Sequence, residues 1–414
     1  MFWAHITTRR KLIAQGAALA ALLALNPVTA VKAGIADDFL ARLSGIDREQ
    51  FQAWRISKRA FEARLDAYWG AIETKRAERR KKKKAQLELT ATDYVQTFPP
   101  EYEGPRLPPE LLKAWNRFIE EEEAKLPKPP VPPPKEIPAL DDFLANAQSV
   151  YGFVPERVSE RAFKERYAEE ALALGLTKAQ VVRVYALETG GQGTADMQSG
   201  IHPITKRGHP ISTALGYAQL LDANSVDELA HHGGAFISRL EQMAGRSELP
   251  HERALQLRAK AKILARMWAD ARSVPDSWSQ HQAFAKTPQG LGIHAINLDG
   301  DIGPMLQAIK LTGLKEDAEK AGKGALKGAE MELMNLTGPG TGLEILLHPP
   351  GAAAPTPNFF ARKAYYVNKM AQNLTGAGLL AELDRRMDMD ISKPGATEFA
   401  SAFDAITTAP LPWR

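Results

Sequence analysis

A proline-rich segment divides this 414-residue chain into a short N-terminal part and a long C-terminal part. Residues 91–139 contain Pro99-Pro100, Pro108-Pro109 and the tract Pro129-Pro130-Val131-Pro132-Pro133-Pro134. Proline fixes φ and removes a backbone donor, so such a segment favours extended polyproline conformation and cannot build a core. We therefore predict a semi-rigid spacer here, interrupted by one short amphipathic helix over residues 109–125.

Both parts that flank the spacer are predicted to be helical, so the expected fold class is mainly α. Residues 34–90 place apolar side chains at three- and four-residue spacings and end in a dense basic run over residues 75–84. Residues 140–391 form the predicted main domain, where helical periodicity dominates and strand-like alternation is scarce. Residues 392–414 carry weak patterning, which predicts a loosely attached tail.

The N-terminus predicts export from the cytoplasm. Residues 1–33 begin with the basic Arg9-Arg10-Lys11, continue with an apolar stretch, and end in Val31-Lys32-Ala33. This order is typical of a signal peptide, and the paired arginines resemble a twin-arginine signal. The expected location is therefore the periplasm or the cell envelope. The alternative is that the same stretch stays attached as a membrane anchor.

Composition excludes several classes of site and partner. The chain has no cysteine, and no two histidines lie one helical turn apart in an H-E-x-x-H pattern, so we expect no metal and no cofactor. Four of the 53 basic residues lie within 1–33, which leaves 49 basic and 49 acidic residues. The pI of 9.0 is thus no argument for nucleic-acid binding. The basic run at 75–84 is either a solvated helix end or a contact with an anionic envelope surface.

Glu188 is the residue whose context most clearly predicts chemistry. Thr177 and Gln180 form a capping-box pattern, and the helix that they begin ends at Gly190-Gly191. Glu188 shares a helix face with apolar residues and lies in the last turn, where the helix dipole repels an anion. Both effects raise the pKa of a carboxyl group, and a protonated carboxyl group can donate a proton in glycosidic cleavage. The alternative is an ordinary glutamate at a helix end.

A second motif, Gly216-Tyr217-Ala218-Gln219-Leu220, follows about 30 residues downstream. Together with Glu188-Thr189-Gly190-Gly191 it resembles the soluble type of lytic transglycosylases and the related lysozyme-like muramidases. In that superfamily a catalytic glutamate in an E-S-G helix end precedes a G-x-M-Q-[IL] segment. The resemblance covers residues 176–226 and implies a lysozyme-like helical catalytic domain.

The resemblance also implies roles for particular residues. Glu188 would act as general acid and then as general base, and Thr189 would replace the usual serine. Gly216, Tyr217 and Gln219 would line the sugar-binding cleft. A tyrosine from Ala364-Tyr365-Tyr366-Val367-Asn368 would hydrogen bond near the acid, so Tyr365 and Tyr366 are both candidates, the alternative being that both are core aromatics.

The implied reaction cleaves peptidoglycan strands between N-acetylmuramic acid and N-acetylglucosamine, with one glutamate and 1,6-anhydro-muramoyl products. A lysozyme-type hydrolase is the first alternative. Inverting hydrolysis would need a second carboxylate, and Asp196 and Asp222 are the nearest candidates in sequence. A non-catalytic peptidoglycan-binding protein and a structural envelope protein are the others. The sequence leaves the oligomeric state open.

Overall fold

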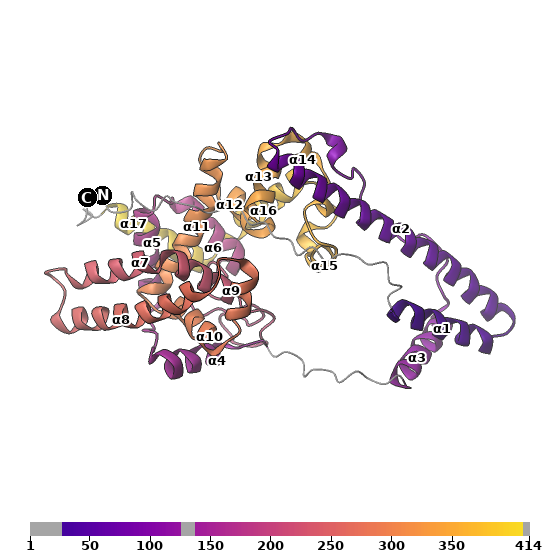
Figure 1. Cartoon of the computed structure of the whole chain (residues 1–414), viewed down its shortest axis with the longest axis horizontal. Helices are drawn as coiled ribbons and strands as arrows, with labels where there is room; N and C mark the ends of the chain where they lie inside the picture. The colour runs from indigo at the N-terminus through magenta and orange to yellow at the C-terminus, as the bar shows by residue number, and fades with distance from the viewer. Residues whose placement is uncertain (1–26, 126–136, 409–414) are drawn as a thin grey trace. The chain divides into compact units, whose positions relative to one another are not determined.

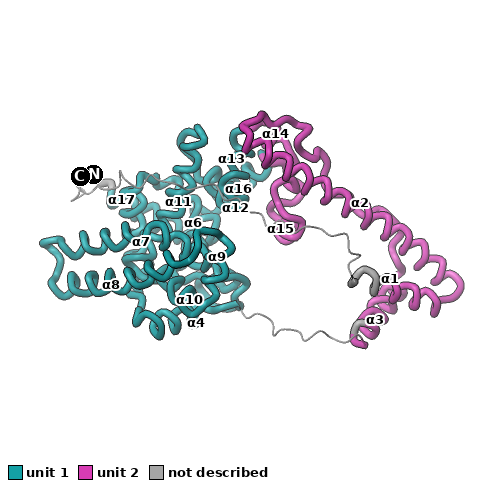
Figure 2. The backbone as a smooth tube through the Cα atoms, in the orientation of Figure 1, with its two compact units in different colours: residues 1–15, 137–347, 377–414 teal, residues 16–136, 348–376 magenta. Residues whose placement is uncertain are grey.

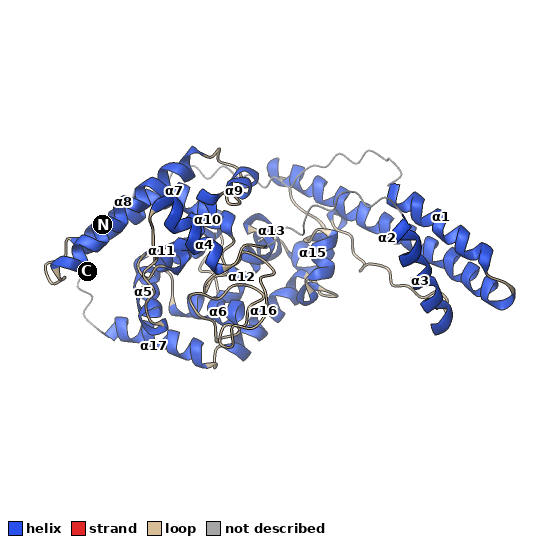
Figure 3. Cartoon of the chain, turned by 90° about the horizontal axis from the view of Figure 1, so that it is seen from below, coloured by secondary structure: helices blue, strands red, loops and turns tan. Residues whose placement is uncertain are grey.

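The computed structural model describes residues 27–125 and 137–408 (Figure 1). Most of the predicted signal peptide and the proline tract at 129–134 lie outside these ranges. The described chain is mainly helical, which confirms the predicted fold class (Figure 3). Extended segments of the described residues pair only in isolated β-bridges. None of its helices is both long and apolar enough to cross a membrane. The chain divides into two compact units (Figure 2).

Unit 1 comprises the described residues 137–347 and 377–408. Its α-helices are α4 (Leu140–Asn146), α5 (Glu160–Ala173), α6 (Lys178–Thr189), α7 (Asp222–Ala244), α8 (His251–Ser273), α9 (Trp278–Phe284), α10 (Pro288–His294), α11 (Ile302–Lys320), α12 (Gly328–Thr337), α13 (Pro339–Leu347), α16 (Gly376–Asp390) and α17 (Pro394–Thr408). The shorter helical turns are η2 (Ala147–Tyr151) and η3 (Ala295–Leu298).

Helix α11 lies at the centre of unit 1. Every residue from Ile302 to Ile309 is buried, and a helix that is buried all round must be enclosed by other elements. The apolar side chains of α11 join a core that includes residues from α7, α8 and α10. Helices α7 and α8 pack side by side as a hairpin (Figure 1).

The C-terminal residues of unit 1 are not a loose tail, which corrects the expectation for 392–414. Residues 394–408 form α17, which packs against α5 and α6. Phe399 and Phe403 are fully buried, and Glu398 forms an ion pair with the buried Lys164 of α5. The sequence pattern of this helix is weak because its apolar face consists of only two aromatic rings and several alanines.

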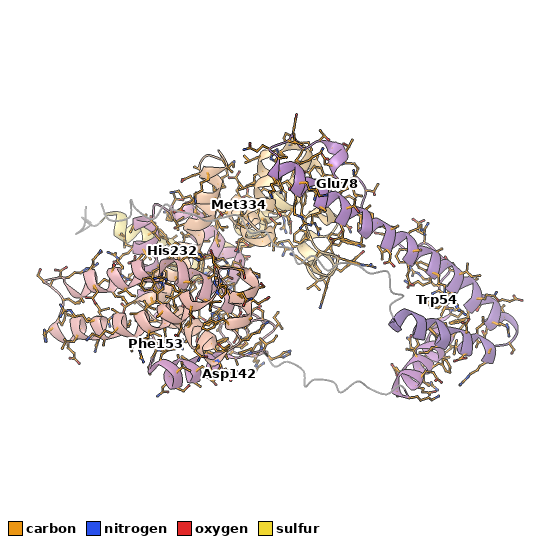
Figure 4. All side chains as sticks on the ribbon, viewed as in Figure 1. Trp54, Glu78, Asp142, Phe153, His232 and Met334 are labelled. Carbon is orange, nitrogen blue, oxygen red and sulfur yellow. The ribbon has the colours of Figure 1, made fainter. Side chains whose placement is uncertain are left out.

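Unit 2 comprises the described residues 27–125 together with 348–376. Its elements are α1 (Pro27–Arg42), α2 (Gly45–Lys84), η1 (Ala91–Asp93), α3 (Pro109–Lys125), α14 (Pro349–Ala353), η4 (Thr356–Asn358), α15 (Arg362–Val367) and η5 (Lys369–Ala371). Helices α1, α2 and α3 share an aromatic core around Phe39, Phe51 and Trp115, beside which Trp54 is labelled in Figure 4.

The predicted spacer is therefore correct only in part. Helix α3 forms at the predicted residues, but it is not an isolated interruption, because Leu107, Leu111 and Phe118 are buried in the core of unit 2. Overall composition did not reveal this packing. One amphipathic helix inside a proline-rich segment is enough to supply an apolar face to a core.

The predicted main domain at 140–391 is interrupted, because residues 348–376 belong to unit 2. The basic run of α2 provides the physical reason. Arg76 donates hydrogen bonds to the carbonyl oxygens of Pro357 and Phe360, and the buried Arg79 donates to that of Asn358 at 2.8 Å. These arginines satisfy backbone acceptors that η4 leaves without helical partners. Part of the basic run is thus structural.

We predict that Phe399→Ala lowers the free energy of unfolding of unit 1 by about 3–5 kcal/mol, because it removes a fully buried ring. Denaturant titration of the full chain measures this loss. Ser401→Ala, on the exposed side of the same helix, is the control and should unfold like the unaltered protein. Equal stability of the two variants would restore the interpretation of this segment as a loose tail.

Candidate active site

Local sequence signals fix both ends of α6. The Thr177 side chain accepts a hydrogen bond from the backbone N–H of Gln180, and the Gln180 side chain accepts one from that of Thr177, so the predicted capping box is confirmed. Gly190 and Gly191 have φ values of 60° and 67°, which confirms the predicted left-handed end. A Cβ atom on Gly191 would lie 2.3 Å from the carbonyl oxygen of Asp390. The segment that joins α16 to α17 therefore packs directly on the helix end.

Glu188 lies in the last turn of α6, where its side chain meets α12. Oε1 of Glu188 accepts a hydrogen bond from Nδ2 of Asn335 at 3.0 Å, and the same amide group contacts Oε1 of Glu332 at 3.3 Å. The carboxyl groups of Glu188 and Glu332 are themselves hydrogen bonded. Helix α12, on which Met334 is labelled in Figure 4, thus places a second carboxyl group beside the predicted acid.

Burial controls the protonation of this pair. Burial raises the pKa of Glu188, the direction predicted from sequence, while the charge of Lys310 and the hydrogen bonds from Glu332 and Asn335 oppose the rise. The pKa of Glu332 is raised well above its usual value by burial and by the negative charge of Glu188. Two adjacent carboxyl groups cannot both ionise cheaply in a site withdrawn from water. Folding therefore favours a state in which the pair shares a proton.

The second motif is built into the loop between α6 and α7. Isolated bridges join Gln198 to Leu215 and Leu215 to Leu220. Gly216 has φ of +75°, and a Cβ atom there would lie 2.5 Å from Nε2 of Gln307. Only glycine fits this position without strain.

Helix α11 connects the two motifs. The side-chain oxygen of Gln307 accepts a hydrogen bond from the backbone N–H of Ala218, and Lys310, whose charge acts on the carboxyl pair, lies three residues further along. Residues three apart share a helix face. In addition, the ring of Tyr185 on α6 lies 4.8 Å from that of Tyr217. The structure therefore brings the loop and the end of α6 onto common supports.

The structure corrects the roles expected for Tyr217 and Thr189. Tyr217 is almost fully buried, and its hydroxyl donates to Glu160, so its side chain supports the loop and does not line a sugar cleft. Thr189 is also buried, and its hydroxyl donates to the carbonyl oxygen of Tyr185 at 2.6 Å. Because this bond uses the hydroxyl proton of Thr189, that proton is not donated to Glu188.

Gln219 keeps a candidate role in the site. Its side chain is partly exposed, and its Nε2 donates to the carbonyl oxygen of Gly216 at 2.7 Å. Its φ of 43° is uncommon for a residue with a side chain. Strained backbone of this kind often occurs at functional loops.

Tyr365 and Tyr366 belong to unit 2, whereas Glu188 belongs to unit 1. The ring of Tyr365 is buried and lies 5.7 Å from that of Trp69 on α2. The hydroxyl oxygen of Tyr366 accepts a hydrogen bond from Nε1 of Trp69 at 3.4 Å. The alternative of a core aromatic therefore holds for Tyr365, while Tyr366 is partly exposed.

The two carboxylates considered for inverting hydrolysis have other partners. Asp196 forms ion pairs with Arg157 and Lys206, each at 2.8 Å, and their charges help to lower the pKa of Asp196 despite its burial. Asp222 is buried at the start of α7, where its Oδ1 accepts a hydrogen bond from the backbone N–H of Ala223. The carboxyl group beside Glu188 is instead Glu332.

Glu332, Asn335 and Lys310 were not predicted from the sequence. The three-residue spacing of Glu332 and Asn335 is the one local signal, because it places both side chains on the same face of a helix. That spacing is common on protein surfaces, so only the packing of α12 against α6 identifies the pair.

We predict that Glu332→Gln flattens the dependence of stability on pH. A carboxyl group whose pKa is raised by folding contributes stability below its unfolded pKa and loses it as pH rises toward its folded pKa. Above about pH 4.5 the unaltered protein should lose up to about 1.4 kcal/mol per pH unit relative to the variant. Denaturant titrations at several pH values measure this difference. Glu319→Gln, an exposed change on α11, should follow the unaltered protein, whereas parallel curves for Glu332→Gln would exclude proton retention.

The geometry thus consists of a proton-sharing carboxyl pair at a helix end and a strained loop, both supported by α11. A scan against protein-family models found no match, and searches of curated proteins and of solved structures found none either.

Proposed function

We propose that this protein cleaves the glycan strands of peptidoglycan between N-acetylmuramic acid and N-acetylglucosamine, with Glu188 as proton donor. The observation that carries the proposal is the adjacent pair of carboxyl groups at the end of α6, bridged by the Asn335 amide, whose outer member, Glu188, is partly exposed. Burial raises the pKa of both members. A lysozyme-like arrangement is supported by the enclosed helix α11 and by the bridged loop between α6 and α7.

The carboxyl pair favours the one-glutamate reaction over hydrolysis with two opposed carboxylates. Retaining and inverting glycosidases hold their two carboxyl groups about 5–5.5 Å and 6.5–9.5 Å apart, on either side of the bond. Glu188 and Glu332 are hydrogen bonded to each other, which leaves no room for a sugar ring or a water between them. Glu332 is accordingly proposed as a positioning residue that keeps a proton available to Glu188.

The proposed reaction balances with one acid that also serves as base. Glu188 gives its proton to the glycosidic oxygen as that oxygen leaves the anomeric carbon of the muramoyl residue. The 6-hydroxyl oxygen of the same residue then bonds to that carbon and closes a 1,6-anhydro ring, and its proton returns to Glu188. Proton donation leaves two adjacent carboxylates, whose repulsion strengthens Glu188 as the base, while the charge of Lys310 limits the cost.

We predict that Glu188→Gln reduces the rate of product formation from purified peptidoglycan by at least about 100-fold, because a near-isosteric amide cannot donate the proton. Mass spectrometry of the digest measures the products. Anhydro-muramoyl ends that are lost in the variant support transglycosylation, and reducing ends that are lost support a lysozyme-type hydrolase. Glu319→Gln is the matched control and should retain activity.

Absence of products from the unaltered protein, under conditions in which a known muramidase works, would exclude the enzymatic proposal. Pull-down with insoluble peptidoglycan then separates the two remaining alternatives. Saturable binding would identify a non-catalytic peptidoglycan-binding protein, and absence of binding would leave a structural envelope protein.

We also propose that the protein acts after export and that the outer side of the basic run contacts an anionic envelope surface. Arg76, Arg79 and Lys82 are engaged within unit 2, whereas Arg80, Lys81 and Lys84 are exposed. Clustered exposed cations near one helix end attract anionic surfaces, and salt screens that attraction.

The combined substitution Arg80→Glu, Lys81→Glu and Lys84→Glu should weaken association with phosphatidylglycerol-containing vesicles at least tenfold. Co-sedimentation at low and high salt measures the association. The matched control also reverses three charges, those of Arg48 on α2 and of Lys113 and Arg117 on α3, all of which are exposed. Equal losses in both variants would indicate a response to net charge alone.

A further inference from the structure

Three potential metal ligands converge where α7 meets the connection between α8 and α9. Asp227 and His231 lie one turn apart on α7, next to His232, which is labelled in Figure 4, and Asp276 lies in the connection. One ligand atom from each of the three side chains lies within 4.8 Å of the others. This cluster is separate from the residues invoked for glycan cleavage.

The hydrogen bonds of His231 define which ring nitrogen is available. Nδ1 of His231 lies 2.8 Å from the backbone carbonyl oxygen of Asp227, which can only accept, so Nδ1 carries a proton and donates it. In a neutral imidazole the other nitrogen, Nε2, then presents a lone pair. Nε2 lies 3.4 Å from Oδ1 of Asp276, which is also an acceptor. Two acceptors at this distance repel each other unless a proton on His231 or a bound metal ion lies between them.

The carboxylate of Asp227 is oriented by a second histidine. His281 on α9 is almost fully buried, and its Nδ1 lies 2.8 Å from Oδ1 of Asp227. This bond fixes the carboxylate relative to His231. Metal ligands in proteins are commonly held in place by hydrogen bonds to neighbouring groups, and the bond from Nδ1 of His231 to a carbonyl oxygen is of the same kind.

We propose that His231, Asp276 and Asp227 bind a divalent transition-metal ion of the zinc class, with His231 coordinating through Nε2. Zinc binds imidazole nitrogen and carboxylate oxygen at about 2.0–2.2 Å in tetrahedral geometry, which places two ligand atoms about 3.4 Å apart. The separation of 3.4 Å between Nε2 of His231 and Oδ1 of Asp276 meets that requirement. An imidazole ligand favours zinc over magnesium or calcium.

The exposure of the three side chains indicates an open site. The side chains of His231, Asp227 and Asp276 are 30%, 27% and 74% exposed, so water can complete the coordination sphere and the ion can enter from solvent. This proposal revises the expectation that the chain binds no metal. The expectation rested on the absence of two histidines one turn apart, whereas here one of the pair is an aspartate and the third ligand comes from a distant connection.

Zinc chloride titrated into the full chain by isothermal calorimetry, after treatment with a chelator, tests the proposal. We expect saturable binding of one ion and a rise in the unfolding temperature. Asp276→Asn should weaken binding at least tenfold, and His231→Gln should abolish it. His251→Gln, at the opposite end of α8, removes an exposed histidine outside the cluster and is the matched control.

The metal-free alternative is a protonated His231 that forms an ion pair with Asp276. It predicts no saturable heat from zinc, no rise in unfolding temperature, or equal binding by Asp276→Asn and the control. Any of these results would overturn the proposal. Because Asp276 is largely exposed, its variant should unfold like the unaltered protein when zinc is absent, which separates loss of binding from loss of folding.

Discussion

The hydrogen bond between the carboxyl groups of Glu188 and Glu332 is the interaction on which the candidate site depends. It joins the last turn of α6 to α12, and it exists only while the pair holds a proton. Asn335 donates to both carboxyl groups, and Lys310 contributes a compensating charge from α11. Side chains from α6, α11 and α12 therefore surround the shared proton. Its loss would leave adjacent negative charges on Glu188 and on the buried Glu332.

The rest of unit 1 holds the end of α6 still. The ring of Phe399 on α17 lies 5.4 Å from that of Tyr185 and 5.6 Å from that of Tyr217, so the C-terminal helix packs against both motif segments. The backbone N–H of Ala396 donates to the carbonyl oxygen of Gly191, directly behind the last turn of α6. A helix end that is fixed in this way keeps the Glu188 carboxyl group in register with α12. The C-terminal helix therefore supports the site, which the weak pattern of its sequence did not indicate.

Sequence alone predicted what is encoded locally. The capping box at Thr177 and Gln180 and the left-handed end at Gly190 each depend on residues within a few positions of one another. The direction of the pKa shift of Glu188 was also predicted, but its largest cause is burial in the folded protein. Features that depend on distant residues were missed or misassigned. Glu332 acquires meaning only from the packing of α12 on α6, and residues 348–376 join unit 2 only because arginines of α2 reach their carbonyl oxygens. Tyr217 was expected to line a sugar-binding cleft, but its side chain is buried, and a sequence motif does not report burial.

One physical rule links the candidate active site and the proposed metal site. In each, two groups that accept hydrogen bonds face each other across a short distance, Glu188 with Glu332 and His231 with Asp276. Glu332 is buried among helices, so the cation that fits between the two carboxyl groups is a proton that they share. The His231 cluster is open to solvent and has a third potential ligand, the carboxylate of Asp227, so the cation proposed there is a larger one with its own water ligands. Whether such a pair holds a proton or a metal ion is thus decided by the access of solvent and by the number of ligands within reach.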